Sequence, residues 1–467
     1  MLTYDLEQAT GPLYQYIYQC LKDDIMTGGL QAGDKLPSKR TFARNHGIST
    51  ITIQNAYDQL ISEGYIYTVP KKGYYVAKIR GMRQVPKETN LSLNIQRQEK
   101  KVEYAVDLSD NRMSPERFPF TVWAKIGREI MSDHKSELME PSPAGGTRAL
   151  REAVAEHLKS YRAMLVDPDQ IVVGAGTEYL YSLLVQLLAP RSTYCLEDPG
   201  YKKIAQVYKR CGVTCRYGRL DDQGITVDSS KRSGADIAHI SPNHHFPTGI
   251  TMPASRRYEV LAWANEKEGR YLIEDDYDSE FRLGGRPVPT LFSIDACEKV
   301  IYMNTFSKSL TPTIRISYMV LPVHLANRFY EELSFYSCTV SNFEQYTLAA
   351  FIKQGYFEKH INRMRLYYAR QRQKIKEVLE KGAPGLPCEI RENDSGLHFL
   401  LHLKTDLTDR EVVKKLAEQG VRVHALSEYY TKKQGEEHFF IINYSNLDVE
   451  KAAAAMEIIA DVTGGKL

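Results

Sequence analysis

Four short stretches place side chains capable of chemistry where apolar, strand-like runs end. In VIYMNTFSKSL (residues 300–310) the hydroxyls of Thr305 and Ser307 precede Lys308, and Arg315 follows seven residues later. A lysine amine can form a Schiff base with an aldehyde, and hydroxyl and guanidinium groups can hold an anion. A lone lysine after a strand is usually a surface charge, so this stretch has to be considered together with the other three.

The other three stretches supply an anion cradle, an aromatic ring and an acid. In VVGAGTEYL a strand ends at Gly176 and Thr177 and a helix begins, so free backbone N–H groups can face a phosphate. EDPGY contains Tyr201, whose ring can stack on a planar ligand, although most of the 31 tyrosines must be core or surface residues. IEDDYDSEF (residues 273–281) follows an apolar run with several carboxylates, which are costly to bury without partners. It is a solvated acidic loop, a metal site or the source of one carboxylate that meets a cation.

These four stretches together contain the groups that pyridoxal 5′-phosphate (PLP) requires. A lysine binds its aldehyde, and an aspartate beside the ring nitrogen keeps that nitrogen protonated and the ring an electron sink. Hydroxyls, backbone amides and an arginine hold the phosphate. We therefore predict a PLP site built from the four stretches.

The elements that must position these side chains alternate along the chain after about residue 107. Strand-like runs separated by helical segments predict a doubly wound α/β domain, which binds ligands at the carboxyl ends of its strands. The runs are QIVVGAG, STYCLED, DIAHISP, RYLIEDD, KVIYMNTF and YMVLP. From about residue 345, a long helix rich in Arg and Tyr and the strands GLHFLLHL and FFIINYS predict a smaller C-terminal α+β subdomain.

The first 79 residues have a different pattern, which predicts a winged helix-turn-helix. Helical spacing runs through residues 11–27, Ser38 can cap a helix over KRTFARNHG, and Ser49 or Thr50 can cap a third over TITIQNAYDQLISEG. Two strand-like runs, YIYTV and GYYVAKI, are then joined by PKKG. A helix pair, a third helix and a hairpin follow the order of that fold. The simpler alternative is a helical interaction module with a solvated basic face.

The predicted DNA contacts divide into two kinds. Basic residues on or before the second helix and at the wing tip are expected to contact phosphates; they are Lys39, Arg40, Arg44, Lys71 and Lys72. Polar residues that open the third helix are expected to meet base edges; they are Ser49, Thr50, Thr52 and Gln54.

Bulk composition indicates a folded protein of two or three domains. The chain has 467 residues, of which 43% are hydrophobic and 25% charged, and its net charge of +3 makes any nucleic-acid footprint local. Seven cysteines fit reduced thiols, and a redox or metal role for Cys211 and Cys215 lacks a second ligand pair. With no signal sequence and no apolar run of about 18 residues, we expect a cytoplasmic protein without membrane contact.

The sequence resembles the MocR-type bacterial regulators, in which a GntR-type winged helix-turn-helix is fused to a fold-type I aminotransferase-like domain. The resemblance covers almost the whole chain. It rests on GDKLPSKRTFA and AYDQLISEGYI, and then on GAGTEYL, EDPGY, SPNHHFPTG, IEDDYDSEF and NTFSKSLTPTIRISYMVLP. The domains expected are a winged helix-turn-helix over residues 1–79, a linker over residues 80–106, and an aminotransferase-like PLP-binding and dimerisation domain over residues 107–467.

The resemblance implies a role for each candidate residue of the cofactor site. Lys308 is the Schiff-base lysine, Asp275 the partner of the pyridine nitrogen, and Tyr277 a donor to the ring hydroxyl. Tyr201 matches the aromatic residue that stacks on the ring. The phosphate-holding positions are Gly176, Thr177, Thr305, Ser307 and Arg315. The remaining acids of the stretch, Asp276, Asp278 and Glu280, are expected to cap, position or solvate their loop, and no metal is expected.

The sequence departs from the aminotransferase pattern at two places. Phe246 stands before Pro247 where these enzymes usually carry an asparagine, and His244 or His245 is the candidate to replace its cofactor contact. The arginine that usually holds a substrate carboxylate near the end of the chain is missing; His438 and Phe439 occupy that neighbourhood, and Arg391 and Arg422 are the candidate replacements. Related DNA-binding domains also often have arginine where Thr50 stands.

Together these features predict a PLP-dependent transcriptional regulator rather than an enzyme. PLP on Lys308, or an amino compound that reacts there, is the expected effector, and the family pattern implies a homodimer on repeated half-sites of double-stranded DNA. One alternative is an active aminotransferase with an appended DNA-binding module. Another is a DNA-binding protein whose large domain has lost the cofactor and only dimerises.

Overall fold

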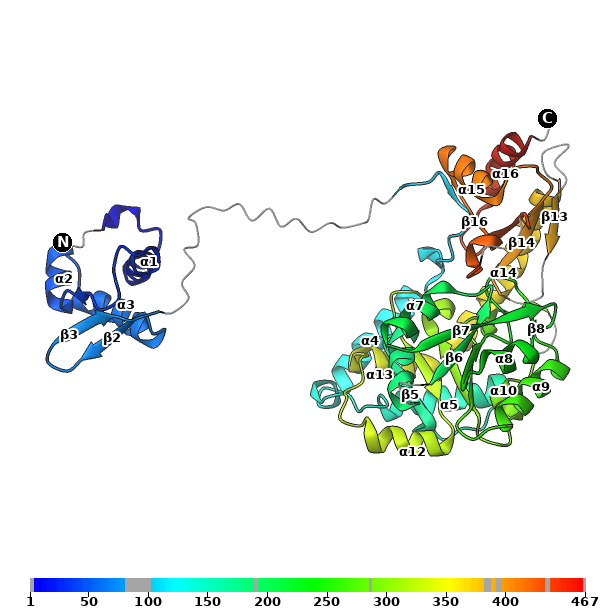
Figure 1. The fold of residues 1–467 in the computed structure, drawn as a ribbon, viewed down its shortest axis with the longest axis horizontal. Coiled ribbons are helices and arrows are strands. Elements are labelled where there is room, and N and C mark those ends of the chain that lie inside the picture. Colours follow the sequence, from blue (N-terminus) through cyan, green and yellow to red (C-terminus); the bar gives the residue numbers. More distant parts are fainter. Residues whose placement is uncertain are drawn as a thin grey trace. The chain divides into compact units, whose positions relative to one another are not determined.

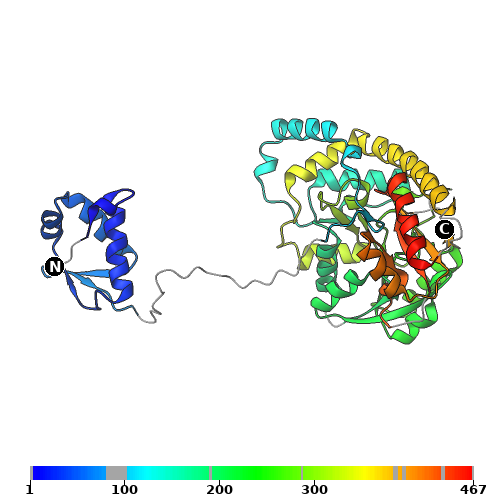
Figure 2. The ribbon, with the colours of Figure 1, turned by 90° about the horizontal axis from the view of Figure 1, so that it is seen from above.

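The chain divides into two compact units, residues 1–100 and residues 101–467 (Figures 1 and 2). The structure is a computed structural model that describes residues 4–79, 102–188, 192–284, 288–381, 388–391, 396–432 and 437–464. Most of the linker predicted over residues 80–106 therefore lies outside the described residues. Its last residue, Val106, pairs within the second unit as part of β4 (Val106–Asp107).

The first unit has the helices and the hairpin that its sequence predicts. Its main helices are α1 (Leu13–Thr27), α2 (Lys39–His46) and α3 (Thr50–Ser62), after the 3₁₀ turn η1 (Leu6–Gln8). Its antiparallel sheet has the order β1–β3–β2, with β1 (Lys35–Leu36), β2 (Ile66–Val69) and β3 (Gly73–Val76). Sequence patterns did not indicate β1, because two residues are too few to show the alternation of a strand.

Serine caps and a glycine turn define where α2 and α3 begin and end. Ser38 Oγ accepts the N–H of Thr41, and Ser49 Oγ accepts the N–H of Thr52, each at 3.2 Å. Gly47 ends α2 with a φ of 65°, a left-handed conformation that glycine adopts without a steric penalty. The start of α3, the helix expected to meet base edges, is therefore set by local chemistry.

A mixed sheet organises the second unit. Its strands are β5 (Ile171–Gly174), β6 (Thr193–Asp198), β7 (Thr214–Asp221), β8 (Gly224–Ile225), β9 (Ile237–Ile240), β10 (Tyr271–Asp275), β11 (Val300–Thr305) and β12 (Ser317–Val320). Their order is β5–β12–β11–β10–β9–β6–β7–β8; β12 and β8 pair antiparallel with their neighbours, and the strands from β11 to β7 run parallel. This is the doubly wound α/β arrangement that the sequence predicts.

Helices cover both faces of this sheet because successive strand residues point to opposite sides. In β5, Ile171 and Val173 pack in one hydrophobic cluster and Val172 packs in another. The first cluster includes residues of α4 (Phe120–Asp133), α5 (Arg148–Arg162) and α13 (Asn342–Lys353). The second includes residues of α6 (Thr177–Leu187), α7 (Lys202–Arg210) and α12 (Val323–Glu332). On the opposite face from this second cluster, a further cluster includes residues of α9 (Ala254–Asn265) and α10 (Leu291–Ile294), and Val227 of α8 (Val227–Ser233) packs against it.

A smaller α+β subdomain follows the long helix α14 (Tyr356–Lys381), as predicted. Its sheet has the order β13–β14–β17–β16, formed by β13 (Cys388–Arg391), β14 (His398–Leu403), β17 (Phe439–Asn443) and β16 (His424–Ala425). Its helices are α15 (Asp409–Glu418) and α16 (Val449–Thr463). A short strand, β15 (Val421–Arg422), pairs in parallel with β4.

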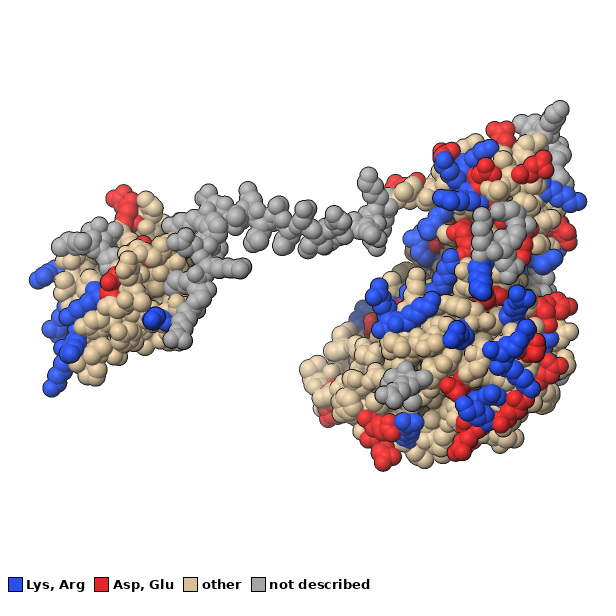
Figure 3. Space-filling view, viewed as in Figure 1, with Lys and Arg blue, Asp and Glu red and all other residues tan. Residues whose placement is uncertain are grey.

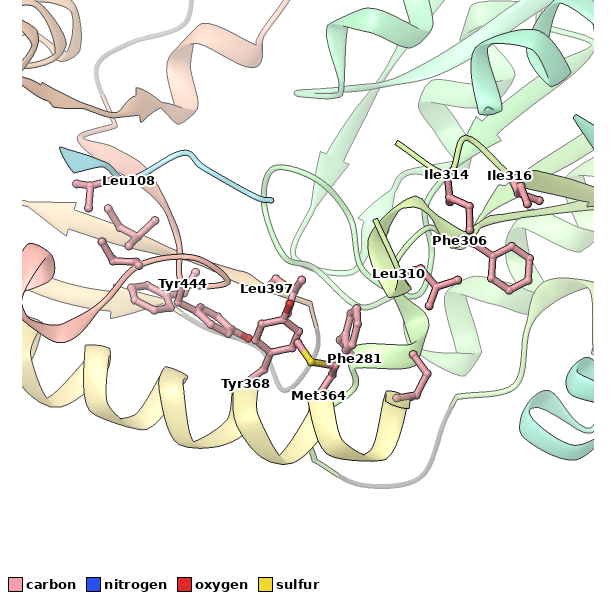
Figure 4. Close-up of a cluster of buried hydrophobic side chains, with 14 of the residues drawn as sticks. Leu108, Phe281, Phe306, Leu310, Ile314, Ile316, Met364, Tyr368, Leu397 and Tyr444 are labelled. Carbon is pink, nitrogen blue, oxygen red and sulfur yellow. The ribbon is translucent and has the colours of Figure 1, made fainter. Parts of the chain in front are cut away.

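One hydrophobic cluster extends from the Lys308 segment into the small subdomain (Figure 4). Phe306 and Leu310, which flank Lys308 in and just after the one-turn helix α11 (Phe306–Ser309), are buried in it. Tyr368 of α14 and Tyr444 of the small subdomain belong to the same cluster. The position of the lysine therefore depends on packing that the two subdomains share.

Candidate cofactor site and DNA-reading surface

The carboxyl ends of β6, β9, β10 and β11 border a cavity of about 320 Å³. It is lined by residues from all four stretches that the sequence singled out: Thr177, Tyr201, Asp275, Tyr277, Thr305, Ser307, Lys308 and Arg315. Gly176 adjoins the cavity as the N-cap of α6, whereas His244 does not line it. Sheet topology thus brings together residues that are far apart in the sequence.

Lys308 reaches the cavity from α11, directly after β11. Thr305 caps this turn, because its Oγ1 accepts the N–H of Ser307 at 3.1 Å and the hydroxyl of Ser317 at 2.8 Å. Burial lowers the pKa of the Lys308 amine, while the carboxylates of Asp278 and Asp110 act in the opposite direction. A neutral amine is the nucleophilic form, so this environment favours reaction with an aldehyde.

Asp275, at the end of β10, has one oxygen with partners and one without. Its Oδ2 accepts the hydroxyl of Tyr181 at 2.7 Å and lies 3.3 Å from Nε2 of His239. Its Oδ1 is buried and has no hydrogen-bond partner among the described residues. A buried carboxylate oxygen without a donor is costly, so a cationic N–H from a ligand ring would fit here. Sequence patterns did not single out Tyr181 or His239.

The turn before α6 forms the other end of the cavity. Gly176 has a φ of 92°, and a Cβ at this position would overlap the guanidinium of Arg315. Arg315 itself has a φ of 52°, a left-handed conformation that costs a non-glycine residue roughly 1–2 kcal/mol. A guanidinium therefore lies over the positive end of a helix, where an anion is favoured. This cradle fits a phosphate.

Two charged residues that sequence reasoning missed also line the cavity. Glu178, in the first turn of α6, forms ion pairs with both Arg315 and Lys203. The signal was available in GAGTEYL, but an acid in the first turn of a helix is common because it complements the helix dipole. Only the packing of α7 beside α6 places Lys203 next to it.

Tyr201 and Phe246 form an aromatic wall of the cavity. Tyr201 is 50% exposed and meets Phe246 edge to face, with ring centroids 5.9 Å apart. Phe246 also packs edge-on against His398 and Tyr429 of the small subdomain. The residue that replaces the usual asparagine is therefore an apolar contact between the two subdomains.

The histidines expected to replace that asparagine are turned to other partners. His244 Nδ1 lies 2.7 Å from Asp278 Oδ2 and 3.2 Å from the hydroxyl of Tyr277. His245 Nδ1 lies 2.7 Å from the hydroxyl of Thr248, and burial lowers its pKa to about 3. His244 thus contacts Tyr277, which lines the cavity, but does not line the cavity itself, because its ring is held by Asp278.

The acids of the acidic stretch are buried, so its interpretation as a solvated loop is wrong. Asp276 Oδ2 accepts the hydroxyl of Tyr302 at 2.7 Å and forms an ion pair with Arg162. Its Oδ1 accepts Nδ2 of Asn243 at 2.7 Å. Burial raises the pKa of Glu280 to about 7. Within the described residues, no group of His, Cys, Asp and Glu is arranged to hold a metal ion.

Neither arginine expected to replace the usual carboxylate-binding arginine lines the 320 Å³ cavity. Arg391 lines a separate hollow of about 1480 Å³ and stacks over the ring of Phe439 at 4.5 Å. Arg422 is exposed and lies 3.5 Å from Asp107. The cations that line the cofactor cavity are instead Lys203, Lys308 and Arg315 among the described residues.

The predicted DNA contacts lie on accessible parts of α2, α3 and the hairpin. Arg40, Arg44, Ser49, Thr50, Gln54, Lys71 and Lys72 are exposed, and Lys39 and Thr52 are half-buried. In Figure 3 the lysine and arginine side chains of this unit gather over α2 and the end of the β2–β3 hairpin. This distribution suits phosphate contacts on either side of a helix in the major groove.

The exposed face of α3 changes the list of base-contacting candidates. Ser49 and Thr52 are engaged with each other, with their hydroxyl oxygens 3.1 Å apart, because they cap the helix. Ile51 is 70% exposed, and Asn55 is exposed one turn further on, beside Gln54. Isoleucine can contact a thymine methyl and asparagine can pair with adenine. The spacing of the buried positions of α3 could have indicated both residues.

Comparisons with known proteins identify the family of each unit. Residues 13–76 match the gntR family of bacterial regulatory proteins, and residues 104–459 match the class I and II aminotransferase family. The chain is similar to the uncharacterized HTH-type transcriptional regulator YdeL of Bacillus subtilis, at 36% identity over 90% of both chains. It is also similar to the probable rhizopine catabolism regulatory protein MocR of Rhizobium meliloti, at 29% identity over 96% of this chain and 93% of that one.

Solved structures share the fold of the second unit. The multiple substrate aminotransferase of Thermococcus profundus superimposes with a TM-score of 0.68 at 22% identity, over 78% of this chain and 92% of that chain. The kynurenine aminotransferase of Pyrococcus horikoshii gives a TM-score of 0.68 at 22% identity, over 78% and 91%. At this identity the likeness establishes the fold-type I architecture of the domain.

Fold and site together define a DNA-binding protein joined to an aminotransferase-like, PLP-type domain. More particularly, the chain belongs to the MocR-type transcriptional regulators, with a GntR-type winged helix-turn-helix before a class I and II aminotransferase domain. The predicted family, the fold and PLP as the cofactor of the domain class are confirmed. Nowhere in the described residues is a helix both long enough and apolar enough to span a bilayer.

The lowered pKa of Lys308 predicts a distinct pH dependence of its reactivity. The protein would be incubated with PLP at a series of pH values, reduced with borohydride and analysed by peptide mass spectrometry. Because its amine loses its proton at lower pH than an ordinary lysine, trapping at Lys308 should persist to lower pH than at the exposed Lys159. Equal midpoints for the two lysines would contradict the effect of burial.

Substitutions of phosphate-contacting and base-contacting residues should affect DNA binding differently. Replacing Lys71 and Lys72 by alanine should weaken binding to specific and unrelated DNA alike and reduce the salt dependence, because phosphate contacts carry no sequence information. Gln54→Ala should cost about 1–3 kcal/mol on the specific site and little on unrelated DNA. Fluorescence anisotropy at several salt concentrations measures both, and a Gln54→Ala variant that weakens both DNAs equally would remove its role in base reading.

Proposed function

We propose that the chain is a transcriptional regulator whose second unit binds PLP on Lys308 and reports the state of that site to DNA binding. The observation that carries this proposal is the convergence of three groups in one cavity. These are an amine of lowered pKa, a buried carboxylate oxygen without a donor among the described residues, and a guanidinium over the start of α6. The winged helix-turn-helix gives the same chain a way to act on DNA.

Each cavity residue has a task in this proposal. Lys308 attaches the cofactor, Asp275 holds a proton on the ring nitrogen, and the hydroxyl of Tyr277 binds the ring hydroxyl. The ring of Tyr201 covers the cofactor, while the cradle residues Gly176, Thr177, Thr305, Ser307 and Arg315 hold the phosphate. When bound, PLP supplies an aldehyde that condenses with primary amines and a ring that withdraws electrons.

An amino compound can serve as effector because it competes with Lys308 for that aldehyde. A displaced Lys308 regains a free amine within a buried cavity, close to the carboxylate of Asp278. Such a change alters DNA binding only if the two states of the site favour different arrangements of the protein. The name of one relative, the pyridoxine biosynthesis transcriptional regulator PdxR of Corynebacterium glutamicum, supports PLP itself as a ligand.

Sensing is favoured over turnover by what lines the cavity. Neither Arg391 nor Arg422 lines it, so neither candidate arginine is in position to hold a substrate carboxylate. Phe246 supplies an apolar contact where aminotransferases usually place an amide. The second candidate function, an active aminotransferase, rests on the activated Lys308 and Asp275. Multiple turnovers of an amino donor and a keto-acid acceptor would establish that second function.

A homodimer is supported by exposed apolar side chains, here called the apolar patch, on segments before α5 and around the start of α13. The patch consists of Met139, Phe335, Tyr336 and Phe343, of which Phe335 is 75% and Met139 74% exposed. Asn342 Nδ2 donates to the carbonyl oxygens of Glu137 and Glu140, which brings these segments together. Between Tyr336 and Asn342, the hydroxyl of Thr339 accepts the N–H of Ala175, which lies in the turn before α6, at 2.9 Å. Large exposed apolar side chains in one region mark an interface.

This dimer would address two half-sites in the DNA, since each copy carries one winged helix-turn-helix. A DNA-binding role also supports a cytoplasmic location.

The sensor proposal predicts that the cofactor site controls DNA affinity. In gel shifts on DNA upstream of the protein's own gene, PLP or PLP with a candidate amine should change the half-saturating protein concentration by roughly five- to 150-fold. Lys308→Ala should abolish this response, whereas Lys159→Ala should keep it. Half-saturation that is the same under every condition would contradict sensing. A large domain that only dimerises would give no absorption change with PLP.

The dimer proposal predicts that a charge in the apolar patch dissociates the protein. Phe335→Glu should shift sedimentation velocity from a dimer to a monomer, because a carboxylate buried in an interface lacks a partner. Leu366→Glu, at a 63% exposed position of α14 outside the patch, is the matched control and should remain a dimer. A Phe335→Glu variant that stays dimeric would move the interface elsewhere.

A further inference from the structure

The cationic end of the cofactor cavity is bridged by a carboxylate of this chain. Arg315 donates through Nη2 to Oε2 of Glu178, and Nζ of Lys203 faces Oε1 of the same carboxylate. All three residues line the cavity. Glu178 therefore already uses the guanidinium that the family pattern assigns to the cofactor phosphate.

This carboxylate lies next to the place where an anionic ligand would bind, because it pairs with the guanidinium beside the start of α6. The Arg315 guanidinium lies so close to Gly176 that a Cβ there would overlap it, and Glu178 is the second residue of α6. Backbone N–H groups and the helix dipole favour negative charge at this end of a helix. The negative charge of Glu178 thus already pairs with the guanidinium at the place where a phosphate would bind.

We propose that Glu178 is an internal competitor of the cofactor phosphate, and that phosphate binds as Arg315 exchanges this carboxylate for it. The inference rests on the proposed function, because it assigns an affinity-determining residue to the same PLP site. Lys203 remains beside Glu178 during the exchange and neutralises it. The ligand class is a phosphate dianion carried by an aldehyde-bearing ring.

The strength of this competition follows from charge and exposure. Burial raises the pKa of Glu178, but Lys203 and Arg315 outweigh it and hold the pKa below its ordinary value, so the competitor is ionised at neutral pH. The side chains of Glu178, Arg315 and Lys203 are 29%, 48% and 49% exposed, which screens their interaction. Removing one nearby negative charge from such a site should strengthen phosphate binding roughly five- to fiftyfold.

Weaker phosphate binding allows a sensor site to respond to the concentration of free PLP. A site that binds its cofactor very tightly is always full and cannot report the free concentration. Competition by Glu178 lowers the apparent affinity of the site for PLP, and it does so without removing any group that attaches or orients the ring. Occupancy of Lys308 then varies with free PLP over a higher concentration range.

The test compares two aldehydes on matched variants. The full-length protein, freed of cofactor, would be titrated with PLP and with pyridoxal, which lacks the phosphate, and binding followed by absorption. Glu178→Gln keeps the shape but not the charge, so it should bind PLP roughly five- to fiftyfold more tightly and pyridoxal as the unaltered protein does. Glu152→Gln is the control, because Glu152 also bridges an arginine and a lysine, Arg148 and Lys353, but outside the cavity.

Two results would overturn the inference: PLP affinity that does not rise in Glu178→Gln, or pyridoxal affinity that rises equally. An unaltered protein without a PLP absorption change would contradict the proposed function instead. In that case the competition would be tested by the thermal stabilisation that inorganic phosphate gives to each variant. Phosphate should stabilise Glu178→Gln more than the unaltered protein or Glu152→Gln, and equal stabilisation would exclude competition at this cradle.

Discussion

Buried carboxylates at the end of β10 are the constraint around which the second unit is arranged. Glu274 and Asp276 place carboxyl groups in a region that excludes water, where an unpaired ion is strongly disfavoured, and burial raises the pKa of Glu274 to about 7. Glu274 accepts the backbone N–H groups of Leu291 and Phe292 at 3.0 Å, and Asp276 is held by Arg162. These partners come from helices on different parts of the chain, so the acids can remain buried only when the whole sheet is assembled.

Asp275 is the last residue of β10, but its carboxylate is only partly bonded within the protein. Its neighbours are held by protein partners, whereas Asp275 lines the cavity and one of its oxygens has no donor among the described residues. The same contrast applies to the cations, since Arg162 is committed to a buried acid while Arg315 is half-exposed and bonded to a carboxylate in the cavity. Groups with partners hold the domain together, and groups with exchangeable partners are available to a ligand.

The cofactor site also touches the small subdomain through apolar and histidine contacts. Phe246 packs on His398 and Tyr429, and His244 lies against His398 with ring centroids 4.7 Å apart. Because His244 is also 3.2 Å from the Tyr277 hydroxyl, a change at that hydroxyl has a direct physical route to the small subdomain. The packing between the two subdomains, which share one hydrophobic cluster, is the element that the proposed sensor would bias.

Local sequence patterns were sufficient for the order of elements and the winged helix-turn-helix, because caps, turns and strand ends depend on neighbouring residues. They also indicated the four stretches whose residues line one cavity. They could not find Tyr181, His239 or Lys203, whose roles arise from contacts between helices and strands that are distant in the sequence. They also could not decide that His244 faces Asp278 rather than the cavity. Side-chain direction and burial depend on which elements pack together, and a charged stretch looks the same in sequence whether it meets solvent or a buried arginine.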